Sequence, residues 1–155
     1  MKSAAAPAHP NEALERLAAG LRAGGTPISS HVVDPVERPV FGLLAALGPR
    51  SASSPGEYAL VVESVREGYL LHYGEPRLLR GHDRDLALLA GDYLYALGIQ
   101  RLAALGDAEA VAVLSELIGR CAQMHTEGRA GEVPALWRAA ALAVGGRDHG
   151  DLPAA

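Results

Sequence analysis

Three arginines in one short segment are the residues best suited to bind an anionic ligand. Arg77, Arg80 and Arg84 lie close together and are interleaved with His82, Asp83 and Asp85. Guanidinium groups bind phosphate oxygens in pairs, and the N-terminus of a helix attracts anions. The segment could therefore hold a phosphate or diphosphate. The alternative is a solvated loop whose charges pair with one another.

Two sets of carboxylates upstream and downstream of these arginines could also do chemistry. Asp92 interrupts an apolar run, and burying a carboxylate among apolar side chains is costly unless it is paired, hydrogen-bonded or protonated. Asp92 should therefore either face a central cavity as a functional group or bind an arginine or a helix end as a structural one. Glu63, Arg66 and Glu67 form either a carboxylate site or a solvated helix face.

The spacing of potential metal ligands predicts no metal site. Cys121 and His125 are one helical turn apart, as metal ligands often are, but no second pair accompanies them. We interpret Cys121 as a small buried thiol. His82 and Asp85 supply two ligands without a third. The sequence also lacks the common nucleotide-binding, zinc-protease and serine-hydrolase motifs, so no cofactor is predicted.

The elements that must position these residues are all helices. Apolar residues recur at helical spacing, and Gly and Pro mark the breaks, which predicts helices over 11–24, 38–47, 56–73, 82–105, 108–128 and 135–144. Ser54, Asp83 and Asp107 are expected near helix starts as caps or favourable acids. Segment 82–105 is apolar nearly all round, which is typical of the central helix of a bundle. We expect an all-α bundle of about six helices.

Length and composition agree with one folded domain and exclude several classes of protein. The chain has 155 residues, of which 49% are hydrophobic, and a net charge of −4. We expect a flexible segment 1–10, one helical domain 11–146 and a flexible tail 147–155. The basic residues are not clustered in the way that nucleic-acid binding requires, so no such binding is predicted. The sequence contains no run of about 18 apolar residues, so no membrane span is predicted. The N-terminus resembles no signal peptide, so the expected location is cytoplasmic.

The segment Leu89 to Leu97, with the sequence LAGDYLYAL, resembles the LAGDxLLA motif of the trans-isoprenyl (polyprenyl) diphosphate synthases. Other motifs of that family have counterparts here. Arg38-Pro39 precedes an apolar helix, as the basic RP pair does in the family. Glu63 and His72 match positions of the pattern IExIHxxSLIHDD, and residues 135–141 are similar to the KTAxLFxAA helix. The resemblance implies a truncated isoprenoid synthase fold.

The chain departs from the family where the family binds magnesium. One register places residues 72–76 at the metal-binding DDxxD motif, and another, anchored on Gly74 and Pro76, places residues 63–67 there. Neither restores two adjacent aspartates. The second Asp-rich motif falls beyond Ala155, and the lysine of KTA is replaced near Val133-Pro134. Ionisation of an allylic diphosphate needs magnesium held by clustered carboxylates. Catalysis by this chain alone is therefore not expected.

The resemblance instead implies a non-catalytic subunit or regulator, similar to the small subunits of heteromeric prenyl synthases. Such a chain docks on a catalytic synthase and influences product length, and magnesium is involved only if that partner supplies the site. A six-helix fragment should leave apolar faces uncovered, so we expect a heteromer or self-association. Two alternatives stay open. One is a binder of a prenyl diphosphate or another anion, with Arg77, Arg80 and Arg84 holding the ligand and Asp92, Glu63 or His72 nearby. The other is an unrelated helical interaction module.

Overall fold

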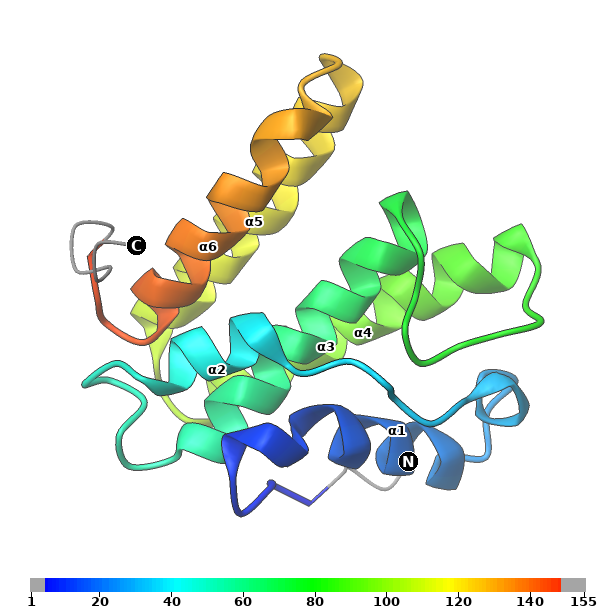
Figure 1. The fold of residues 1–155 in the computed structure, drawn as a ribbon, viewed down its shortest axis with the longest axis horizontal. Helices are drawn as coiled ribbons and strands as arrows, with labels where there is room; N and C mark the ends of the chain where they lie inside the picture. Colours follow the sequence, from blue (N-terminus) through cyan, green and yellow to red (C-terminus); the bar gives the residue numbers. More distant parts are fainter. Residues whose placement is uncertain (1–4, 149–155) are drawn as a thin grey trace.

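The computed structural model describes residues 5–148, which fold into six α-helices (Figure 1). They are α1 (Ala13–Ala23), α2 (Val40–Ala46), α3 (Pro55–Tyr73), α4 (Arg84–Ala104), α5 (Ala108–Thr126) and α6 (Val133–Val144). Short 3-10 helices form at Pro10–Glu12, Ser29–His31 and Ala130–Glu132. No strand forms within the described residues, where Val32 and Leu79 make one isolated antiparallel bridge. The predicted all-α bundle is confirmed.

Capping aspartates explain two of the helix starts. Asp83 and Asp107 each cap a helix, α4 and α5 respectively, by accepting a hydrogen bond from a first-turn backbone N–H. Ser54 holds the predicted N-cap position of α3, but its side chain makes no cap hydrogen bond. Glu57, three residues later, instead accepts two hydrogen bonds from Arg101, each 2.7 Å long. This ion pair ties the start of α3 to the end of α4.

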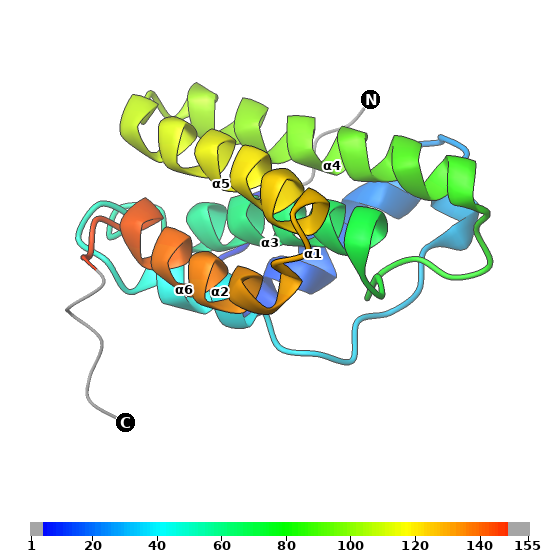
Figure 2. The same ribbon diagram turned by 90° about the horizontal axis from the view of Figure 1, so that it is seen from above.

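The most deeply buried helix is α3, and the expectation that segment 82–105 is central is wrong. α3 packs against α1, α2 and α4 and is buried on nearly every side. α4 covers one side of α3, while its own outer face leaves Leu88 and Leu89 exposed by 39% and 62%. Figure 2 shows α4 at the edge of the bundle. Within residues 5–148 no helix, α4 included, has the sustained hydropathy over its length that crossing a bilayer requires.

Glycines let α3 and α4 pack in close contact. A Cβ atom on Gly68 would lie 2.8 Å from the carbonyl oxygen of Gly91, and one on Gly98 would lie 2.6 Å from a side chain of α3. Real Cβ atoms do not approach so closely, so larger residues would push the helices apart. Ser64 Oγ donates a hydrogen bond to the Leu94 carbonyl at 2.8 Å across the same contact. The register between the two helices is therefore fixed by backbone proximity.

Two large hydrophobic clusters form most of the core. One lies under α1 and includes Leu14, Leu78 and Leu94, and the other joins α3 to α5 and α6 around Val62 and Trp137. α5 and α6 form a hairpin that leans away from the α3–α4 pair (Figure 1).

The predicted flexible ends fall mostly outside the described residues. Of the segment 1–10, residues 5–10 are placed, and Pro7 is buried against Gly56 at the start of α3. Of the tail 147–155, only Arg147 and Asp148 are described. The guanidinium of Arg147 donates a hydrogen bond to the Leu47 carbonyl at 3.2 Å, so this residue is anchored to the C-terminal end of α2.

Candidate functional site

Glu63, Glu67 and Arg77 form a buried ion cluster beside α3. Arg77 Nη1 lies 2.6 Å from Glu63 Oε2, and Arg77 Nε lies 2.9 Å from Glu67 Oε2. The remaining oxygens accept hydrogen bonds from backbone N–H groups: Glu63 Oε1 from Gly42, and Glu67 Oε1 from Arg77 and Leu78. Both glutamate side chains are 0% exposed. All four carboxylate oxygens are thus occupied from within the chain.

This ion cluster brings together Glu63 and Arg77, two of the residues predicted to bind a ligand. Burial lowers the pKa of Arg77, but the attraction of Glu63 and Glu67 outweighs burial and raises it. A buried Arg–carboxylate pair of this kind keeps its charge only because the partners satisfy one another. The three side chains join α2, α3 and the segment before α4, which is a structural role.

Arg80 and Arg84 lie apart from that cluster. Arg80 is exposed, and its Nη1 donates hydrogen bonds to the carbonyls of Pro76 and Leu79. Arg84 is the exposed first residue of α4. The structure therefore places the three predicted arginines in three different environments. Binding of an anion at Arg80 or Arg84 stays a prediction.

Asp92 pairs with His72 on the surface. His72 Nε2 and Asp92 Oδ1 lie 3.0 Å apart, and the Asp92 side chain is 75% exposed. The expectation of a buried Asp92 is wrong, because Asp92 is on the outer face of α4, beside the exposed Leu88 and Leu89. The expected tie to a neighbouring helix is present, but the partner is a histidine rather than an arginine or a helix end.

Most of the aromatic side chains gather where α3 faces α5 and α6. Phe41, Trp137 and three of the five tyrosines in the chain take part, together with two histidines. We call this group the aromatic cluster: Phe41, Tyr69, His72, Tyr73, Tyr95, His125 and Trp137. Neighbouring ring centroids lie 4.1 to 5.9 Å apart. The cluster is a continuous series of ring contacts from α4 across α3 to α2 and α6.

Arg66 lies over this cluster and is the residue that sequence reasoning undervalued. Its guanidinium carbon is 4.9 Å from the ring centroid of Phe41, 5.1 Å from that of Tyr69 and 5.0 Å from that of Trp137. Ring faces attract cations electrostatically. Because Glu63 and Glu67 are close to Arg66 in the sequence, the three charges suggested one exposed helix face. In the structure Arg66 faces the aromatic rings, whereas Glu63 and Glu67 face Arg77. The sequence signal was the only arginine of this helix, placed between Tyr58 and Tyr69.

Cys121 and His125, one turn apart on α5, have different surroundings. His125 Nε2 lies 2.8 Å from the Tyr69 hydroxyl, and its ring stacks on Tyr73. Cys121 is buried, and burial raises the pKa of its thiol to about 11. Among the residues that the structure describes, no group of three or more potential ligands is arranged to hold a metal ion.

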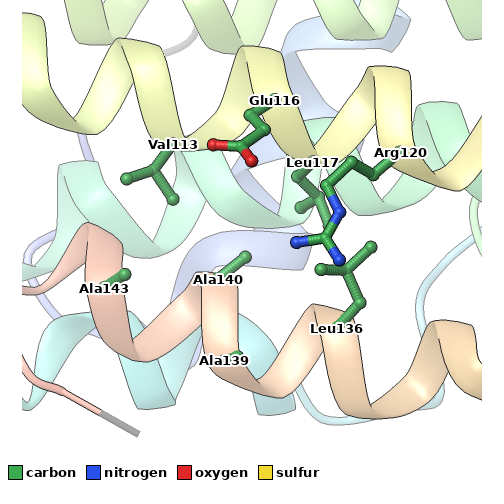
Figure 3. A pocket seen from close by; sticks show the side chains of 8 residues that line it. All are labelled: Val113, Glu116, Leu117, Arg120, Leu136, Ala139, Ala140 and Ala143. Carbon is green, nitrogen blue, oxygen red and sulfur yellow. The ribbon is translucent and has the colours of Figure 1, made fainter.

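An apolar pocket of about 210 Å³ lies between α5 and α6 (Figure 3). Apolar side chains form most of its wall, and Glu116 and Arg120 extend from α5 beside it. Its lining residues are Val113, Glu116, Leu117, Arg120, Leu136, Ala139, Ala140 and Ala143. None of the six predicted ligand-binding residues lines this pocket. Its composition suits an apolar side chain better than a diphosphate.

Comparison of the chain with family models, curated proteins and solved structures gives no match. The similarity to the prenyl synthases therefore rests on the motifs themselves, and the function must be argued from the side chains and their contacts.

Proposed function

We propose that this chain is a non-catalytic relative of the trans-isoprenyl diphosphate synthases. In this proposal it acts as a subunit or regulator of a catalytic prenyl diphosphate synthase in isoprenoid biosynthesis. The motifs from Arg38 to Gly146 suggest the family, and the state of one acidic pair suggests the role.

The observation that carries the proposal is the occupied pair Glu63 and Glu67. In the register anchored on Gly74 and Pro76, these residues stand where the family has its first Asp-rich motif. Carboxylates that hold magnesium need oxygens that face a site open to water and to the diphosphate. Here each oxygen accepts a hydrogen bond from within the chain, and neither side chain is exposed. This pair stabilises the fold, which supports a role that needs no metal-assisted ionisation.

The outer face of α4 is the surface that we propose for the partner. Leu88 and Leu89 are exposed there, and the described residues provide no element that covers them. Two exposed leucines next to one another on this face offer apolar area that a partner could bury. The partner that fits the proposal is a catalytic synthase.

Two measurements test this proposal. The purified chain alone, given isopentenyl diphosphate, an allylic primer and Mg²⁺, should form no prenyl product, and any sustained turnover would overturn the non-catalytic role. Mixed with a full-length prenyl diphosphate synthase from the same genome, it should form a stable complex in size-exclusion chromatography and change the distribution of product lengths. Absence of a complex with every such synthase would overturn the subunit role and favour an interaction module of another kind.

A matched pair of variants tests the proposed face. Leu89→Arg places a charge on the outer face of α4 and should abolish the complex. Leu47→Arg, at the C-terminal end of α2, changes a leucine of nearly equal exposure, 65% against 62%, and should leave the complex intact. Equal binding by both variants would show that the partner uses another surface.

A further inference from the structure

Arg66 is a half-buried cation that no acidic side chain neutralises. Among the described residues its guanidinium makes no ion pair and donates no hydrogen bond, and its contacts are the faces of Phe41, Tyr69 and Trp137. Glu63, one turn earlier on α3, and Glu67, the next residue, are both already bound by Arg77. Burial and the repulsion of Arg77 lower the pKa of Arg66. Attraction by nearby groups, Glu63 among them, offsets this effect only in part.

The geometry leaves the hydrogen-bonding capacity of Arg66 unused. A guanidinium has five N–H donors in its plane, whereas a ring beneath it interacts with its face. The three ring contacts supply no acceptor atom, so the N–H donors have none among the described residues. The indole Nε1 of Trp137 is also buried, and the weak acceptor that it faces is the sulfur of Cys121. The donors without an acceptor in the aromatic cluster are therefore those of Arg66.

The surroundings of Arg66 indicate what kind of molecule would accept these hydrogen bonds. Leu70 and Tyr73 follow Arg66 at helical spacing on the same side of α3; Leu70 is half-buried, and Tyr73 is 40% exposed. An incoming anion would therefore meet a cation flanked by aromatic and aliphatic surface. Inorganic ions gain little from such surface, whereas a molecule with an apolar body gains from its burial.

We propose that Arg66 and the aromatic cluster bind a small organic anion, a carboxylate or phosphate monoester carried on an apolar chain or ring. The anionic group accepts hydrogen bonds from the Arg66 guanidinium, and the apolar body lies against the neighbouring rings. This site is separate from the predicted arginine segment around Arg80 and Arg84 and from the outer face of α4. It is independent of the subunit role, so either proposal can fail without the other.

The fluorescence of Trp137 provides the assay, because it is the only tryptophan in the chain and contacts Arg66 directly. The full chain is titrated with hexyl phosphate and hexanoate, and with inorganic phosphate and hexanol as probes that each carry half of the proposed chemistry. Saturable one-to-one binding of an alkyl anion, at least tenfold tighter than that of either half-probe, is expected. The stronger of the two alkyl anions identifies the headgroup as phosphate or carboxylate.

Variants assign the binding to Arg66. Arg66→Met keeps an apolar chain over the rings and should weaken the alkyl anion at least tenfold, while Arg84→Met, which removes the exposed arginine of α4, should leave it unchanged. Arg66→Lys keeps the charge but loses the planar fork, so it should bind with intermediate affinity, and it serves if the methionine variant does not fold. No saturable binding of any alkyl anion, equal affinity of the parent and both Arg66 variants, or loss only in Arg84→Met would each overturn the proposal.

Discussion

Replacing Arg77 by methionine should remove a large part of the stability of the fold. The change leaves Glu63 Oε2 and Glu67 Oε2 without their donors, in side chains that are 0% exposed. The backbone N–H groups that bind the other two oxygens remain in place. Two buried carboxylates then face one another across the space that the guanidinium occupied, and water cannot solvate either of them.

The magnitude follows from the geometry. Breaking a buried ion pair by removing one partner costs about 3–5 kcal/mol, because a charge is left uncompensated. Small domains are stable by only about 5–15 kcal/mol in total. For a chain of this length, about 1 kcal/mol corresponds to a shift of about 2–4 °C in Tm. Arg77→Met should therefore lower Tm by about 6–20 °C and shift the urea midpoint accordingly.

Urea unfolding followed by circular dichroism at 222 nm measures this effect, with two reference variants. Arg22→Met breaks the Arg22–Asp34 pair, whose side chains are 43% and 86% exposed, and should cost less than about 1 kcal/mol. The triple variant E63Q/E67Q/R77M removes all three charges and should recover part of the loss. Equal losses in Arg77→Met and Arg22→Met, or a triple variant no more stable than Arg77→Met, would falsify the view that the ion cluster balances buried charge.

Three further perturbations test other parts of the fold. Gly68→Ala should destabilise the chain by about 1–3 kcal/mol, because the added methyl group meets the backbone of α4. Gly119→Ala, whose methyl group meets nothing within 4 Å, should stabilise the chain by about 0.5–1 kcal/mol. If urea unfolding gives both variants a change of the same sign, the close α3–α4 contact is contradicted. Burial and the hydrogen bond to Asp107 raise the pKa of Tyr58 to about 12, above the value of about 10 in an unfolded chain. The stability advantage of the parent over Tyr58→Phe should therefore be present below about pH 10 and vanish by about pH 12, and a constant difference across this range would argue against it. Because the pKa of the Cys121 thiol is raised to about 11, Ellman's reagent should label native protein at pH 8 far more slowly than protein in urea; equal rates would show that the thiol is accessible.

The helices could be predicted closely from the sequence, but their depth in the bundle could not. Helical periodicity and the caps at Asp83 and Asp107 act within a few residues, so they are visible in the chain itself. Which of two apolar helices becomes central depends on what covers it. The sequence of α4 is more apolar than that of α3, yet α3 lies at the centre because α1, α2 and α4 all pack on it.

The charges of α3 were hard to interpret for the same reason. Glu63 and Glu67 resemble a solvated face until Arg77, ten residues after Glu67, folds back onto them. Arg66 is separated from these carboxylates only by the direction in which its side chain leaves the helix, and the rings of α2 and α6 that it contacts are distant in sequence. Motif spacing identified Glu63 and His72 as notable positions, but their partners are set by tertiary contacts.

The ion cluster also settles how α3 is rotated about its own axis. A helix that is buried on nearly every side gains almost the same apolar burial in several orientations, so hydrophobic packing alone selects among them weakly. Any other rotation would turn Glu63 and Glu67 toward apolar neighbours and leave Arg77 without acceptors, at a cost of several kcal/mol. Three polar residues thus specify a single orientation of the central helix, and with it which side chains of α3, Arg66 among them, face α5 and α6.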